Sequence, residues 1–214
     1  MWNLRLNNRR DWFEEHKEEY KNDFLAPMKE LGREVFESVA NTRGDYGFIH
    51  KVSRIYKDAR RVHDGEPYRD HLWFSFEKPS EDWISKPVFW FELGPEEWSY
   101  GLGYYAAKPI TMAKFRARID KNPKKLEALA ARLDKQDEFT LDGAEYARKK
   151  PAPTAKTESW YNKKSFSLIH IQPNGRELFS SGFVNRLAAG YEFLMPFYDY
   201  FVTLDSDPDP ADNH

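Results

Sequence analysis

Residues 86–107 read KPVFWFELGPEEWSYGLGYYAA, and this stretch decides the fold class. On either side of Gly94 and Pro95 the side chains follow a period of two, which is typical of β-strands. The connection between the two runs is too short to hold a crossover helix, so the strands are predicted to pair antiparallel.

Further patterns extend outward from this pair. Strands are also predicted over residues 48–60, 71–78 and 165–172. Helices are predicted over residues 9–24, 28–39, 111–122, 123–136 and 184–201. We expect Asn7 and Asn8 to cap the first helix, Pro27 to interrupt or restart it, and residues 148–160 to form an exposed loop.

Helices, then strands, then helices again predict an α+β fold rather than an alternating parallel sheet. We predict a single domain over residues 1–204, with an antiparallel sheet of about four to six strands flanked by N-terminal and C-terminal helices. Residues 205–214 are acidic and rich in proline, and they are predicted to form a disordered tail.

Composition excludes several classes of function. The 214 residues carry a formal net charge of −2, so no overall field attracts nucleic acid or an anionic membrane, and nucleic-acid binding is disfavoured rather than ruled out. The absence of cysteine excludes disulfides and thiolate catalysis. No apolar run reaches membrane-spanning length and the N-terminus lacks a signal-peptide core, so we expect a cytoplasmic protein without membrane contact. The oligomeric state is left open.

Charge is concentrated in the segment 54–76, RIYKDARRVHDGEPYRDHLWFSF, directly before an aromatic strand. If the segment begins as an extended chain, alternate side chains project from one face, namely Arg54, Tyr56, Asp58 and Arg60. Asp58 would then lie between two guanidinium groups. It could satisfy them internally, or orient them so that their remaining donors face an anion.

The function favoured by this pattern is binding of a small anionic ligand, through a phosphate or carboxylate group, at the hairpin. The predicted ligand-binding residues are Arg54, Lys57, Asp58, Arg60, Asp64, Tyr68 and His71. Acidic and imidazole groups at such a site could also act as a general acid or base, so the sequence does not decide between binding and catalysis.

Two alternatives to this hypothesis remain. The hairpin charges could simply pair across the strands as scaffolding, for about 0.2 to 1 kcal/mol each. The basic and aromatic face could instead form a noncatalytic interaction module for protein or nucleic acid, since the strands at 86–107 are rich in aromatic rings that could stack on bases. We favour burial of those rings under helices, because helices lie on both sides of the strands in the sequence.

No cofactor or metal is predicted. The chain lacks a glycine-rich phosphate loop, a dinucleotide fingerprint, an HExxH helix and a nucleophile elbow. Its GLGYY stretch is explained by close backbone approach or a bulge.

The chain resembles the bacterial proteins of domain of unknown function family 2461. NNRRDWFEEHKEEY matches an N-terminal motif, RIYKDARRVHDGEPY an arginine-rich signature, and GLGYYAAKPITMAKFRARI a strand leading into a helix. The signature residues fall on Arg54, Asp58, Arg60, Asp64, Pro67 and Tyr68. The sequence departs from the signature at Lys57 for arginine, Arg61 for phenylalanine and Gly65 for lysine. The resemblance implies no activity, but it favours a functional hairpin.

Overall fold

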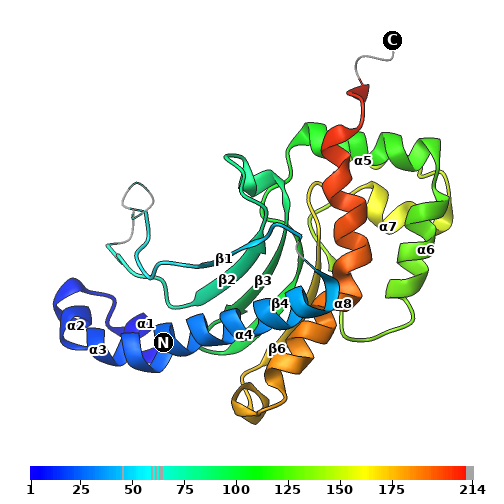
Figure 1. Ribbon diagram of the computed structural model, residues 1–214. Helices are drawn as coiled ribbons and strands as arrows, with labels where there is room; N and C mark the ends of the chain where they lie inside the picture. The colour runs from blue at the N-terminus through cyan, green and yellow to red at the C-terminus, as the bar shows by residue number, and fades with distance from the viewer. Residues whose placement is uncertain (45, 59, 61, 63–64, 211–214) are drawn as a thin grey trace. The chain divides into compact units, whose positions relative to one another are not determined.

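A computed structural model describes residues 1–44, 46–58, 60, 62 and 65–210. It confirms the α+β prediction: one antiparallel sheet of six strands, in the order β1-β2-β3-β4-β6-β5, with helices from the N-terminal and C-terminal parts of the chain (Figure 1). The strands are β1 Ile49–Val52, β2 Leu72–Glu77, β3 Pro87–Leu93, β4 Glu97–Tyr104, β5 Thr140–Asp142 and β6 Ser167–Pro173.

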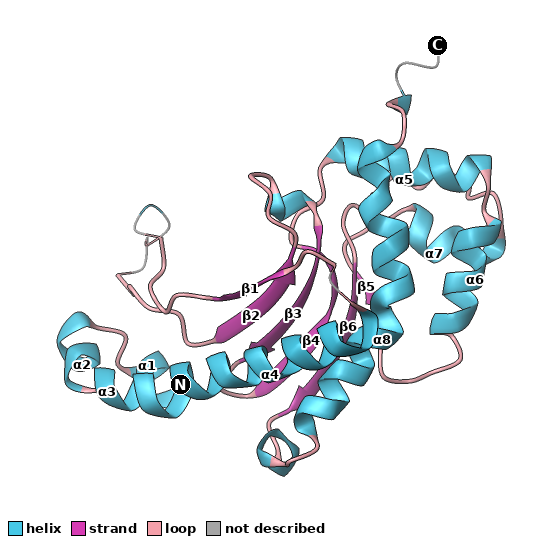
Figure 2. Cartoon of the chain, in the orientation of Figure 1, coloured by secondary structure: helices cyan, strands magenta, loops and turns pink. Residues whose placement is uncertain are grey.

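Helices make up most of the remaining chain (Figure 2). The α-helices are α1 Trp2–Leu6, α2 Arg10–Glu15, α3 Lys17–Tyr20, α4 Ala26–Arg43, α5 Pro109–Lys121, α6 Lys124–Leu133, α7 Glu158–Tyr161 and α8 Phe183–Val202. Short helical turns of other types are η1 Lys21–Leu25, η3 Trp83–Ser85, η4 Ala155–Thr157, η5 Arg176–Phe179 and η6 Thr203–Ser206. None of these described helices is long and apolar enough to cross a membrane.

The chain divides into two compact units. Unit 1 comprises Met1–Glu77, Trp90–Tyr100 and Ile171–Ala189, and unit 2 comprises Lys78–Phe89, Gly101–His170 and Gly190–His214. The predicted boundary between a folded domain ending at residue 204 and a disordered tail stays a prediction. Within unit 2, Asp205 forms an ion pair with Lys86 and Asp207 one with Arg118, while residues 211–214 lie outside the described part.

The predicted asparagine cap is wrong. Helix α2 begins after Arg9, and no side chain caps it. Asn7 bonds to the carbonyl of Asn3 in the preceding turn, and Asn8 bonds to the backbone of Tyr68, 60 residues away. A tertiary partner therefore takes the side chain that the local pattern assigned to the helix end.

Pro27 restarts the helix, as its missing N–H predicts. The π-helical turn η1 leads directly into α4, with Pro27 in the first turn of α4, where the backbone N–H has no intrahelical partner. A wider turn of this kind accommodates the proline without ending the chain's helical path.

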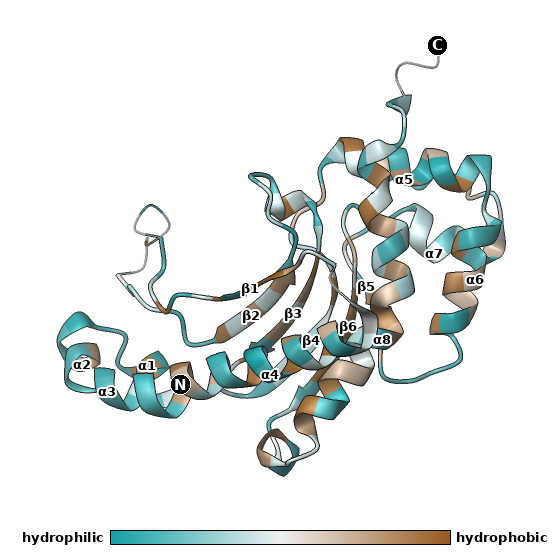
Figure 3. Ribbon diagram, in the orientation of Figure 1, coloured by the Kyte–Doolittle hydropathy of each residue, from teal (hydrophilic) through white to brown (hydrophobic). Residues whose placement is uncertain are grey.

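The core of unit 1 lies between α4 and the first two strands. Helix α4 lies along β1 and β2 (Figure 1), and Phe36 meets Phe76 edge to face with centroids 5.3 Å apart. Strand β2 is apolar where it faces this helix (Figure 3), and Phe74 is completely buried. Gly32 on α4 leaves room for His50, because a Cβ there would come 2.2 Å from His50 Nε2. Burial lowers the pKa of His50, so its imidazole stays neutral in this apolar contact.

Aromatic rings fill the core of unit 2. Phe166 on the chain before β6 meets Phe115 of α5, Trp160 of α7 and Phe201 of α8, with centroids 4.9 to 5.6 Å apart. Gly103 of β4 confirms the expected close backbone approach, since a Cβ there would lie 2.6 Å from the carbonyl oxygen of Phe166. The aromatic residues of β4 are buried as predicted, including Tyr104 at 7% exposure.

Three predicted elements differ from the structure. The strand predicted over residues 48–60 ends at Val52, and residues 140–142 form a short strand that was not predicted. The segment predicted as an exposed loop, 148–160, ends in η4 and α7, and Trp160 is 2% exposed. Its tryptophan is buried because it packs on Phe166, a contact that proline and lysine content does not reveal.

Candidate functional site

The predicted hairpin exists, but as a loose ladder rather than a continuous strand. Beyond β1, Tyr56 and Tyr68 form an isolated antiparallel bridge. The Arg69 side chain donates to the carbonyl of Arg54 at 2.9 Å and to that of Tyr56, which holds this segment in place. The expected alternation holds locally, because Ile55 is buried at 3% while Arg54 and Tyr56 are exposed on either side of it.

Asp58 and Arg60 pair with each other. The guanidinium of Arg60 donates to both carboxylate oxygens of Asp58, at 3.1 and 2.8 Å, and the Arg60 backbone N–H adds a third bond at 3.1 Å. Lys57 forms a longer ion pair with Glu66 at 3.4 Å. Of the two guanidinium groups expected to flank Asp58, one is therefore taken up by that carboxylate. The predicted site residue Asp64 lies outside the described residues.

Arg54 is different. Its side chain is exposed, and within the described part of the chain its guanidinium has no hydrogen-bond or ion-pair partner. The Arg69 side chain bonds to the backbone carbonyl of Arg54, not to its guanidinium. Five N–H donors are thus available to an outside group.

Tyr68 lies in the core rather than on the open face. Its side chain is 2% exposed, and its ring stacks on Phe13 with centroids 4.1 Å apart. Its backbone N–H donates to Asn8 Oδ1 at 3.0 Å, and its carbonyl accepts from Asn8 Nδ2 at 2.9 Å. Tyr68 therefore packs beneath the hairpin, against Phe13, and does not lie on its exposed side.

A cleft of about 350 Å³ opens beside Arg54, between the helices at residues 13–29 and the chain at 52–56. Its apolar lining comes from Phe13, Leu25, Val52 and Ile55, with the phenols of Tyr20 and Tyr56. Four cations also line it, namely Lys17, Lys21, Lys29 and Arg54. Lys17 is paired with Glu14 at 2.8 Å and Lys21 with Glu18 at 2.6 Å. Like Arg54, Lys29 has no side-chain partner among the described residues.

The phenols of the cleft are suited to donating hydrogen bonds. Burial, reinforced by the neighbouring Tyr56, raises the pKa of Tyr20 to about 12. Tyr20 therefore stays protonated at neutral pH, and a neutral phenol can donate to an anion without repelling it. Tyr20 and Phe13 pack with ring centroids 5.5 Å apart, which fixes the cleft wall.

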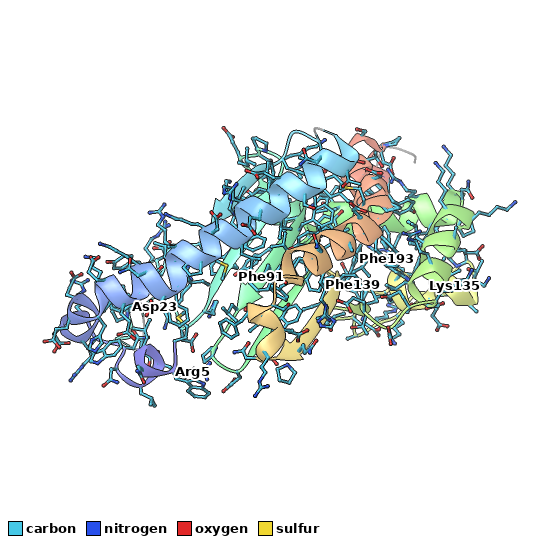
Figure 4. The ribbon with its side chains drawn as sticks, turned by 60° about the horizontal axis from the view of Figure 1, so that its bottom comes forward. Arg5, Asp23, Phe91, Lys135, Phe139 and Phe193 are labelled. Atoms are coloured by element: carbon cyan, nitrogen blue, oxygen red, sulfur yellow. The ribbon has the colours of Figure 1, made fainter. Side chains whose placement is uncertain are left out.

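His71 belongs to another location, a hollow of about 130 Å³ lined also by Arg5, Asp70 and Glu92. His71 Nδ1 lies 2.9 Å from Asp70 Oδ1, and Arg5 (labelled in Figure 4) bonds the second oxygen of Asp70 at 2.5 Å. Burial opposes ionisation of Asp70, but the bonds from His71 and Arg5 outweigh it and hold its pKa below the usual range. Burial raises the pKa of Glu92.

The hollow thus contains two carboxyl groups whose pKa values shift in opposite directions, downward for Asp70 and upward for Glu92. Its volume fits a few water molecules, whereas pockets for organic ligands occupy roughly 300 to 1,000 Å³. No group of three or more acidic or histidine side chains in the described residues could hold a metal ion.

A family comparison agrees with the family resemblance of the sequence. The model of the family described as "Conserved hypothetical protein (DUF2461)" matches residues 1–200 of the 214-residue chain. The chain belongs to this family. No curated protein matches the DUF2461 chain. The description of the DUF2461 family names no activity, and family membership alone assigns none to this chain.

Sequence reasoning missed most of the cleft. Lys29 and Tyr20 lie on helices whose periodicity predicts only amphipathic packing, and Arg69 is not among the predicted site residues. The signal that could have revealed Lys29 is weak: a lysine directly after the buried Met28, near the start of a helix that has Pro27 in its first turn.

Proposed function

We propose that this protein binds a small organic anion, a carboxylate or phosphate group attached to an apolar body, in the cleft beside the hairpin. The observation that carries the proposal is the pair of cations Arg54 and Lys29, which line an apolar cleft and have no side-chain partner within the described residues. The volume of about 350 Å³ lies in the range typical of small-molecule pockets.

The two cations supply the anion site. Arg54 presents a planar fork that matches the two oxygens of a carboxylate or phosphate. The bonds from Arg69 to the backbone at Arg54 and Tyr56 hold this segment in one conformation, so less entropy is lost when a ligand binds. Lys29 adds a second positive charge without a fixed geometry.

The remainder of the lining favours an apolar body on the ligand. Phe13 and Ile55 are almost fully buried, at 2% and 3% exposure, so they form a firm floor. Tyr20 and Tyr56 add ring faces and hydroxyl groups at the sides. A bare inorganic anion would leave the apolar lining of the cleft exposed to water, whereas a ligand with an aromatic or aliphatic part would bury it.

The proposal is tested by calorimetric titration with phenyl phosphate and benzoate, compared with inorganic phosphate and neutral benzyl alcohol. We expect the organic anions to bind more tightly than either comparator. Replacement of Arg54 or Lys29 by glutamine removes a charge-assisted bond of roughly 1.5 to 3 kcal/mol, so the Kd should rise about tenfold to a hundredfold.

Arg60→Gln is the matched control, because Arg60 carries the same charge on the same hairpin but is paired with Asp58 and does not line the cleft. Equal losses in the Arg54, Lys29 and Arg60 variants would indicate general charge attraction and reject the cleft. Tighter binding of a single-stranded oligonucleotide than of phenyl phosphate would instead support a macromolecular interaction surface.

A further inference from the structure

Unit 2 contains a larger groove that the hairpin does not explain. It measures about 1180 Å³ and lies between the end of α5, helix α6 and the second half of α8. In Figure 4, Phe193 on α8 and Lys135 just beyond α6 are labelled at this part of the molecule. The volume exceeds the roughly 300 to 1,000 Å³ of a typical small-molecule site, so the groove has room for a larger partner.

The groove is basic, although the whole chain is slightly acidic. Five cationic side chains line it, namely Arg118, Lys121, Lys125, Arg132 and Lys135, against two acids, Asp199 and Asp207. The ammonium groups of the three lysines are exposed and have no partner within the described residues. The local charge is therefore opposite in sign to the net charge of −2.

The groove already accepts one carboxylate. Asp207, from the acidic end of the chain, accepts a bond from Arg118 Nε at 2.6 Å. Arg118 is held for this contact by bonds to the carbonyl of Tyr200 at 2.6 Å and to Thr203 at 2.9 Å. Its guanidinium also stacks over the Tyr200 ring at 5.0 Å. Within this groove, an arginine held in a fixed position thus pairs with a side-chain carboxylate of the same chain.

Apolar surface lies among the cations. Leu129 and Pro196 are half-buried, and Phe193 is covered on one side by the guanidinium of Arg132 at 4.5 Å. Phe193 also stacks on Phe139, with centroids 5.9 Å apart. Apolar contacts between rows of charge suit an amphipathic peptide, whereas a phosphate backbone would gain little from Leu129 or Pro196.

We propose that this groove binds an acidic amphipathic peptide segment of a partner protein. Carboxylates of the segment pair with Lys121, Lys125 and Lys135, as Asp207 pairs with Arg118. Leucine-like side chains of the segment cover Leu129 and Phe193. The proposal is independent of the cleft beside Arg54, because the two sites share no residue.

The test is fluorescence anisotropy with a labelled peptide in which pairs of glutamates alternate with pairs of leucines. Two exposed ion pairs at about 0.7 kcal/mol each amount to about 1.4 kcal/mol, so the double variant Lys121→Glu, Lys125→Glu should bind about tenfold more weakly. Lys124→Glu is the matched control for the single variant Lys125→Glu, because Lys124 is exposed on α6 next to Lys125 but does not line the groove.

Three comparators keep the proposal falsifiable: polyglutamate, an oligouridylate, and the same peptide with lysine in place of glutamate. Support requires that the glutamate–leucine peptide binds more tightly than all three. Tighter binding of the oligouridylate, equal binding of polyglutamate, no binding at low salt, or equal losses in the Lys124 variant would each overturn the proposal.

Discussion

Replacing Asn8 by alanine should destabilise the protein strongly, although Asn8 is only a polar residue near the N-terminus. The side-chain amide of Asn8 bonds to both backbone groups of Tyr68, as a neighbouring strand would. Asn8 Nδ2 donates to the Tyr68 carbonyl at 2.9 Å, and Asn8 Oδ1 accepts from the Tyr68 N–H at 3.0 Å. Tyr68 is 2% exposed, so water cannot readily replace the lost partner. The variant leaves one backbone N–H and one carbonyl unsatisfied.

The magnitude follows from these two groups. A typical hydrogen bond contributes about 0.5 to 1.5 kcal/mol, and a buried group left without a partner costs about 1 to 3 kcal/mol. Since Tyr68 is bonded on both sides by Asn8, we expect Asn8→Ala to lower the free energy of unfolding by about 3 kcal/mol. For a chain of this size, this loss lowers the Tm by roughly 6 to 12 °C.

The assay is urea unfolding followed by circular dichroism, with Asn7→Ala as the control. Asn7 makes one exposed bond to the carbonyl of Asn3 in its own turn, so its loss should cost under about 1 kcal/mol. Asn8→Asp keeps an acceptor for the Tyr68 N–H but places a carboxylate against the Tyr68 carbonyl, so it should not rescue stability. If Asn8→Ala costs no more than Asn7→Ala, the bridging role of Asn8 is refuted.

Two further changes should alter stability for different reasons. Burial raises the pKa of Glu92 in the folded protein. Protonated Glu92 therefore contributes its full share to the free energy of unfolding below the pKa of the unfolded chain, and this contribution is lost as pH rises through the pKa of the folded protein. Glu92→Gln should therefore gain stability relative to the native protein as pH rises, and a difference that stays constant from acid to alkaline pH would contradict this in urea unfolding. Gly103→Ala should lower the free energy of unfolding by about 2 to 3 kcal/mol, because the added Cβ would lie 2.6 Å from the carbonyl oxygen of Phe166. Gly182→Ala is the control, since a Cβ at Gly182 meets open space and should change the Tm little. Equal Tm values for the two variants would be inconsistent with the close approach at Gly103.

Much of the fold could be predicted because long helices and strands show, in their own sequence, the regular spacing of the side chains that they bury. In β4, Trp98, Tyr100 and Leu102 are all completely buried, and this alternation is visible in the sequence. The strand Thr140–Asp142 has only three residues, too few to show a period, and it forms because β6 offers a partner. Long-range pairing of this kind leaves no local signal.

The candidate site was predictable only in part, for a related reason. The charged hairpin was visible, and Arg54 and Tyr56 do share its open side. Whether a charge is satisfied depends on its neighbours in space, and the sequence could not show that Arg60 would be paired with Asp58. Nor could the sequence show that Lys29, 25 positions earlier on a helix, lines the same cleft as Arg54.

The two stretches of sequence that resemble family motifs contact each other in the structure. Asn8 and Phe13 of the N-terminal motif hold Tyr68 of the arginine-rich signature, by backbone bonds and by ring stacking. Phe13 in turn forms the floor of the cleft. Tyr68 therefore supports the cleft through Phe13 without lining it, whereas Arg54 lines the cleft and has no side-chain partner within the described residues.

Two positions at which the sequence departs from the signature, Gly65 and Lys57, lie away from the cleft. Gly65, which stands where the signature has lysine, has a φ of 76°, in the left-handed region that glycine favours. Neither Gly65 nor Lys57 lines the cleft. Both departures therefore lie outside the lining of the cleft, and an anion site formed by Arg54 and Lys29 would persist despite them.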